Sequence, residues 1–126
     1  MRILHVLTYV GPGNPFGGPA SVARGQADEL RRRGHEVVVA AAQSRPRRSS
    51  WRASSVGVRG FDSYRVLPGA GFSGIVAPGL LRFAARDLRS FDVVHVHLAR
   101  DLVTLPIALM ALRAKVPYVL QPHGMV

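Results

Sequence analysis

The chain of 126 residues contains no cysteine and no apolar run long enough to cross a bilayer. The first absence excludes disulfide frameworks, thiolate zinc sites and cysteine nucleophiles, and it fits a reducing compartment. The longest apolar stretch, residues 102–112, contains Pro106 and is too short for a transmembrane helix. The opening MRILHVLTYVG continues into a Gly/Pro segment rather than a cleavage site. We therefore expect a cytoplasmic protein, with the inner membrane face as the alternative location.

Acidic residues are also scarce: 7 Asp and Glu stand against 17 Lys and Arg, giving a formal net charge of +10. All the basic residues except Lys115 are arginine. Such a surface attracts polyanions, anionic lipid or phosphorylated small molecules, but an arginine-biased composition on solvated faces explains it equally well. No nucleic-acid-binding motif accompanies the charge, so we expect no nucleic acid partner. No two carboxylates are placed for glycoside hydrolysis.

Five short apolar runs predict strands buried in a parallel sheet. They cover residues 3–7, 36–42, 64–67, 92–96 and 117–120. Helical patterns alternate with these strands, beginning at Pro19, Leu81 and Leu102. This alternation predicts the α/β class, as a Rossmann-like doubly wound parallel sheet of order 3-2-1-4-5. We expect residues 1–126 to form one incomplete domain of this kind.

The connecting segments have distinct compositions. Small apolar residues recur at helical spacing in the first helix, at Ala20, Ala23, Ala27 and Leu30. Gly34 predicts the end of that helix. Residues 43–60 are rich in Arg and Ser and predict a mobile basic loop, with Trp51 as its candidate anchor, and residues 68–74 predict a glycine-rich turn. The second helix is expected to bury Leu81, Ala84, Ala85 and Leu88.

Ligands of doubly wound sheets bind beyond the carboxyl ends of the strands, where the strand order reverses. That rule selects residues 11–18, 97–101 and 121–124. Gly17 and Gly18 open the first helix, whose backbone N–H groups suit a phosphate, although a flexible loop would need the same glycines. The spacing departs from the G-x-G-x-x-G fingerprint and no GK[ST] follows, so we expect neither NAD or FAD nor a P-loop. Asp101 is expected to cap the third helix.

Histidines mark the same region. His95 and His97 lie two apart on one strand and share a face, but no acidic or thiolate partner stands at ligand spacing, so we expect no metal. His97 ends its strand, whereas His95 and His5 are interpreted as core residues. His123, between Pro122 and Gly124, could hydrogen-bond a sugar hydroxyl or stabilise developing charge. A loop histidine without function is the competing interpretation.

Four pieces of the chain follow one pattern in order. They are MRILHVLT, Gly17-Gly18, LRRRGHEVVV, and DVVHVH with PYVLQPHG. Together they resemble the N-terminal, acceptor-side domain of GT-B glycosyltransferases of family 4, the group of bacterial mannosyl- and glucosyltransferases of envelope polysaccharides and glycolipids. The resemblance covers essentially the whole chain.

The resemblance implies retaining transfer of a sugar from a nucleotide-diphosphate donor to a hydroxyl acceptor, without a metal or other cofactor. It implies that the Gly17-Gly18 loop approaches the donor phosphates and the acceptor, and that His123 contacts the donor sugar. By the same resemblance His97 and Asp101 lie at the acceptor cleft, with Gly124 beside His123. A C-terminal domain supplies most donor contacts in that family and is absent here, so we expect a truncated domain, inactive alone, whose uncovered helix 102–112 favours a homodimer.

Two other interpretations remain open. The net charge and the basic segment 45–52 fit a non-catalytic module of the same fold that binds an anionic or lipid-linked partner. Another doubly wound protein, such as an epimerase or a receiver domain, fits less well. Epimerases need the tight dinucleotide fingerprint, and receiver domains need acidic residues after the first strand, where Thr8 and Tyr9 stand.

Overall fold

The fold is a single parallel sheet between helices, in a computed structural model that describes residues 1–10, 17–43, 58–62, 64–65, 75–98 and 102–122. The strands of this sheet are β1 (Arg2–Val10), β2 (Glu36–Gln43), β3 (Val58–Asp62), β6 (Val93–Leu98) and β7 (Tyr118–Pro122). They lie in the order β3-β2-β1-β6-β7, and every neighbouring pair is parallel. Numbered within the sheet, this is the predicted order 3-2-1-4-5.

The third strand of the sheet does not lie where the sequence predicted it. Residues 58–62 pair with β2, so part of the predicted basic loop belongs to the sheet. Within the predicted strand 64–67, β4 (Tyr64–Arg65) pairs antiparallel with β5 (Ile75–Val76) instead, and the rest lies outside the described residues. Because β3 is an edge strand, it tolerates Arg59 and Gly60, which a search for continuous apolar runs passes over.

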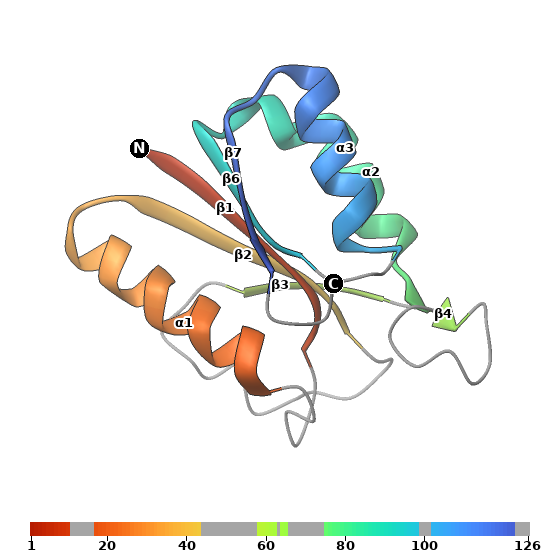
Figure 1. Ribbon diagram of the computed structural model, residues 1–126, viewed down its shortest axis with the longest axis horizontal. Helices are drawn as coiled ribbons and strands as arrows, with labels where there is room; N and C mark the ends of the chain where they lie inside the picture. The colour runs from red at the N-terminus through yellow and green to blue at the C-terminus, as the bar shows by residue number, and fades with distance from the viewer. Residues whose placement is uncertain (11–16, 44–57, 63, 66–74, 99–101, 123–126) are drawn as a thin grey trace.

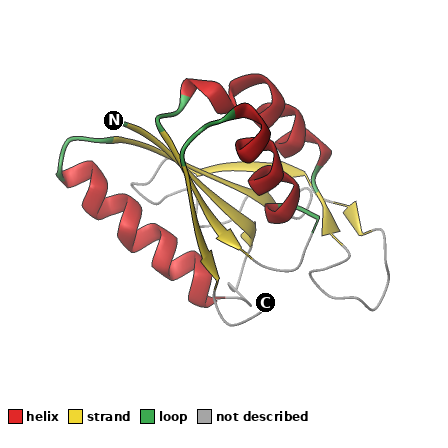
Figure 2. Cartoon of the chain, turned by 45° about the horizontal axis from the view of Figure 1, so that its top comes forward, coloured by secondary structure: helices red, strands yellow, loops and turns green. Residues whose placement is uncertain are grey.

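Helices cover both faces of the sheet, which makes three layers (Figures 1 and 2). On one face lies α1 (Gly17–Arg32), and on the other lie α2 (Pro78–Asp87), the short 3-10 helix η3 (Leu88–Ser90) and α3 (Thr104–Ala114). Gly34, at φ +92°, adopts the left-handed conformation that follows a helix end, as predicted. The N-cap of α3 is Val103 rather than the predicted Asp101, which lies outside the described residues, as do Trp51 and residues 68–74.

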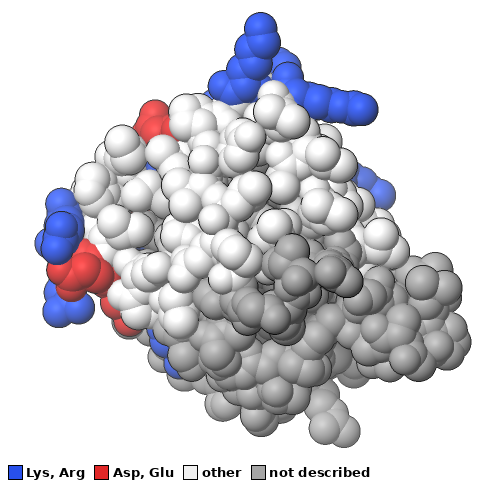
Figure 3. Space-filling model, in the orientation of Figure 1, with Lys and Arg blue, Asp and Glu red and all other residues white. Residues whose placement is uncertain are grey.

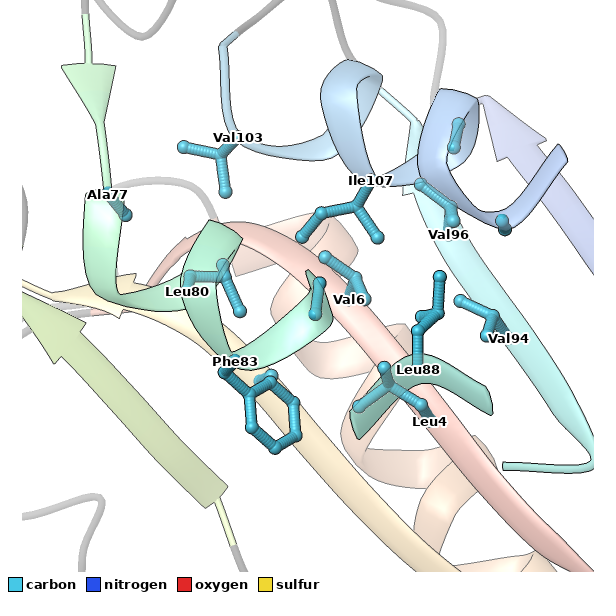
Figure 4. Close-up of a cluster of buried hydrophobic side chains, with 14 of the residues drawn as sticks. Leu4, Val6, Ala77, Leu80, Phe83, Leu88, Val94, Val96, Val103 and Ile107 are labelled. Carbon is cyan, nitrogen blue, oxygen red and sulfur yellow. The ribbon is translucent and has the colours of Figure 1, made fainter. Parts of the chain in front are cut away.

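Alternate residues of β1 supply two separate cores, because successive side chains of a strand point to opposite faces. Leu4 and Val6 face α2 and α3 in the larger core, part of which Figure 4 shows. Ile3 and Leu7 face α1, where Ala23 packs at 0% exposure. Small residues on α1 let its axis lie close to the sheet, as the alanine stripe predicted.

The buried side of α2 is rotated from the predicted one. Leu80, Phe83 and Ala84 are buried, whereas Ala85 is exposed and Leu81 only half-buried. Phe83 explains the rotation, since its ring centroid lies 5.4 Å from that of Phe61 and 6.3 Å from that of Phe91. Across the described ranges, no helix is long and apolar enough to span a membrane.

We expect substitutions on the two sides of α3 to have different effects. Ile107 is fully buried in the larger core, so Ile107→Ala should lower the free energy of unfolding by about 2–5 kcal/mol through lost burial and a cavity. Leu109 is 54% exposed on the same helix, and Leu109→Ala should change stability by roughly 0.5 kcal/mol or less. Urea denaturation of the two variants measures both values, and equal losses would contradict the packing described here.

Candidate functional site

The candidate site lies where β1 and β6 adjoin at the middle of the sheet. From β1 the chain crosses to β2 on one side, and from β6 it crosses to β7 on the other, so the strand order reverses between them. The helices that make these two crossovers, α1 and α3, lie on opposite faces (Figure 1). The carboxyl ends of β1 and β6 therefore border the position where doubly wound sheets bind their ligands.

The first turn of α1 lies at this end of the sheet. Gly17 and Gly18 are the first two residues of the helix, as predicted, and its first turn contains no acidic residue. The N–H groups of a first helical turn have no partner within the helix, and the helix dipole adds partial positive charge there. An anion is therefore the ligand that this terminus favours. Residues 11–16, which precede it, lie outside the described residues.

Three histidines meet on the α1 side of the sheet. The register pairs His5 of β1 with His95 of β6, and His97 follows two residues further along the same face. Nδ1 of His5 lies 3.0 Å from Nε2 of His97, and both side chains are buried. The rings stack, with centroids 4.6 Å apart for His5 and His95 and 4.5 Å apart for His95 and His97. We call these three residues the histidine cluster.

Two glutamines extend the histidine cluster toward β7 and α1. Nε2 of His95 lies 2.7 Å from Oε1 of Gln121, so the imidazole donates and the amide oxygen accepts. The same oxygen accepts a hydrogen bond from Nε2 of Gln26 at 3.3 Å. Gln121 stands two residues before His123 in the sequence. A polar path therefore links the middle of the sheet to the strand that leads into the Pro-His-Gly segment.

Burial keeps His5 neutral. Burial first, and the neighbouring His95 second, lower the pKa of His5 from 6.5 to about 4. Within 3.0 Å of each other, His5 Nδ1 and His97 Nε2 must share one hydrogen, because two facing lone pairs would repel. Nε2 of His5 is buried and has no hydrogen-bond partner among the described residues.

The predicted site residues fall into three groups. Gly17 and Gly18 open α1 at the expected end of the sheet. His97 lies near the end of β6, but its side chain is only 2% exposed and contacts His5 rather than solvent. Asp101, His123 and Gly124 lie outside the described residues.

Sequence reasoning missed the contact of His5 with His97 and the contribution of Gln121. His5 was correctly predicted to be buried, but it was considered alone. A signal was present: the predicted strand order makes 3–7 and 92–96 neighbours. Aligning the apolar residues of ILHVL with those of VVHVH places histidines at matching positions.

The fold is similar to a solved one, the crystal structure of MurG from Acinetobacter baumannii. The two share 17% sequence identity at a TM-score of 0.58, over 96% of this chain and 34% of the other. At this identity the similarity establishes the Rossmann-like fold alone. The chain spans about a third of the length of that protein.

A family comparison defines the class. Residues 17–126 match the family described as "Glycosyl transferase 4-like domain", so the chain belongs to this family. The resemblance drawn from the sequence motifs is thereby confirmed, and the domain is of the glycosyltransferase kind. No curated protein matches the chain.

The lowered pKa of His5 makes stability depend on pH. His5 binds a proton below about pH 6.5 in the unfolded chain but only near pH 4 in the folded chain. The contribution of His5 to the free energy of unfolding is therefore complete above pH 6.5 and is lost as the pH falls toward 4. Between pH 7 and 4.5 we expect His5 to account for about 2 to 3 kcal/mol of lost stability. Urea denaturation at both pH values should show a smaller loss in His5→Val than in wild type. Equal losses would contradict the assignment.

Proposed function

We propose that this chain forms the acceptor-side half of a retaining glycosyltransferase. The whole enzyme would transfer a sugar from a nucleotide-diphosphate donor to a hydroxyl group of an envelope glycan or glycolipid. The family match over residues 17–126 is the observation that carries the proposal. The start of α1 at Gly17, beside the strand-order reversal, supports it because a helix N-terminus without acidic residues favours an anion there.

The donor diphosphate is proposed to lie near the first turn of α1. Gly17 and Gly18 have no side chain beyond hydrogen, so a phosphate can approach their backbone closely. The turn carries no carboxylate to repel it, and the net charge of +10 favours an anionic donor. The nucleotide sugar is then a substrate, and the proposed transfer needs no metal or cofactor.

His123 is the proposed catalytic residue, with Gly124 beside it. The segment follows β7, whose Gln121 is hydrogen-bonded to both His95 and Gln26. A neutral imidazole would donate to a hydroxyl of the donor sugar and stabilise charge as the glycosidic bond breaks. Asp101 is proposed at the acceptor side. For His97 the contact with His5 favours holding the end of β6 in place over touching the acceptor.

A C-terminal donor-binding domain is the proposed partner of this half. Alternatively, a second copy of this chain would cover the exposed helix α3 in a homodimer. We place the enzyme in the cytoplasm, at the inner membrane face where a lipid-linked acceptor would lie.

We expect the chain alone to be inactive and the chain joined to a donor-binding half to transfer sugar from a nucleotide donor. In that complete protein His123→Ala should lower kcat about 100-fold or more, since it removes a group acting in the transition state. His35→Ala, at a position before β2, is the matched control and should leave kcat unchanged. Radiolabelled sugar transfer measures both, and full activity of His123→Ala would overturn the site.

A second candidate function, binding of an anionic or lipid-linked partner without catalysis, is favoured by the surface of α3. Four leucines on or beside this helix are between 42% and 56% exposed: Leu102, Leu105, Leu109 and Leu112. Arg113 and Lys115 are exposed at its end. Figure 3 shows an uncharged surface over α3, with Lys and Arg side chains projecting along one edge. An apolar stripe beside cations suits the headgroup region of an anionic bilayer.

We expect the protein to sediment with anionic vesicles at low salt and to be partly released by high salt. Replacing Leu105 and Leu109 by Ser should weaken vesicle binding about tenfold or more, because their side chains would no longer enter the acyl boundary. Val22→Ser, an exposed valine on α1, is the matched control. Gel filtration of both variants distinguishes a loss of vesicle binding from a loss of homodimer formation. No binding of wild type at low salt would remove this candidate.

A further inference from the structure

The proposed sugar transfer assigns no chemistry to the histidine cluster. Two of its members come from one strand at positions i and i+2, and the third comes from the neighbouring strand at the matching register position. One ligand nitrogen of each ring lies within 4.8 Å of the others. Three imidazoles are a ligand set that zinc sites use when they keep a fourth position open.

The distances are close to those that a metal requires. A tetrahedral Zn²⁺ ion with bonds of about 2.0–2.1 Å holds its nitrogen ligands about 3.3 Å apart. His5 Nδ1 and His97 Nε2 are already 3.0 Å apart, so an ion replacing the shared hydrogen needs them to separate by only a few tenths of an ångström. Both side chains are buried in the sheet, which keeps this pair preorganised.

The ring of His95 must rotate before all three imidazoles can bind one ion. Its ring and that of His97 are parallel within 6° and stacked, so one ion cannot lie in both ring planes in this arrangement. His95 is the half-buried member of the cluster, so its ring is the one that would rotate. The rotation gives up the hydrogen bond of 2.7 Å to Gln121.

We propose that His5, His95 and His97 bind one divalent transition-metal ion, with Zn²⁺ as the best-matched ion. Imidazole ligands suit Zn²⁺, Cu²⁺ and Ni²⁺, and three imidazoles with an open fourth position are a ligand set that Zn²⁺ uses. The sequence argument against a metal considered only the pair on β6, and β1 adds the third imidazole that the pair lacked. The ion ties β1 to β6 beneath the cleft. This proposal does not rest on the glycosyltransferase function.

The test is titration of the purified, tag-free protein with Zn²⁺ after chelator treatment, followed by calorimetry and thermal unfolding. We expect one equivalent to bind and the melting temperature to rise by about 5 °C or more at saturation. Co²⁺ should give the strong visible absorption of a four-coordinate ion. Absence of stoichiometric binding by the wild-type chain would overturn the proposal.

Variants identify the ligands. His95→Gln is the informative substitution, because its side chain is half-buried and the amide can still donate to Gln121. It should lower Zn²⁺ affinity at least tenfold and weaken the Co²⁺ absorption, and His97→Gln should do the same. His35→Gln, in the turn before β2, is the control and should bind as wild type does. Retained affinity in a folded His95→Gln variant, checked by circular dichroism, would refute the site. If His97→Gln does not fold, histidine ring ¹⁵N spectra of the wild type decide instead, since Zn²⁺ must shift all three rings.

Discussion

The parallel register between β1 and β6 is the constraint on which the rest of the structure depends. Pairing of Ile3 with Val93 fixes which side chains of both strands face α1 and which face α2 and α3. If β6 slipped by one residue against β1, Val94 and Val96 would turn out of the larger core that they share with Leu4 and Val6. The slip would also separate the histidines that now face one another. One set of backbone hydrogen bonds therefore determines both the packing of the larger core and the position of the histidine cluster.

The fold was largely predictable from sequence, for a physical reason. Strands buried on both faces are continuous apolar runs, and β1, β2, β6 and β7 all stand out on that basis. The edge strand β3 does not, because its sequence VRGFD is not a continuous apolar run. On α2 the periodicity located the helix but not its buried side, because that side depends on how Phe83 packs against Phe61 and Phe91.

The site was predictable only in part. The start of the first helix at Gly17 and Gly18 was predicted, whereas their contact with a ligand stays a prediction because a flexible loop would need the same glycines. His95 and His97 were considered as a pair and His5 apart from them, because the contact of His5 with His97 joins residues 92 positions apart and appears only when the two strands are aligned as neighbours. Gln121 illustrates the same limit, since an amide at a strand end has no distinctive signature until its partners on β6 and α1 are known.

The outer edge of the sheet has a consequence of its own. In the described part of the chain, β7 bonds to β6 along one side only, and Tyr118, Val119 and Leu120 are each more than 40% exposed. A strand with free peptide groups and apolar side chains is a template that any extended segment can join. Within the described residues, this edge is therefore the place where an extended segment, of this chain or of another, can add a strand to the sheet.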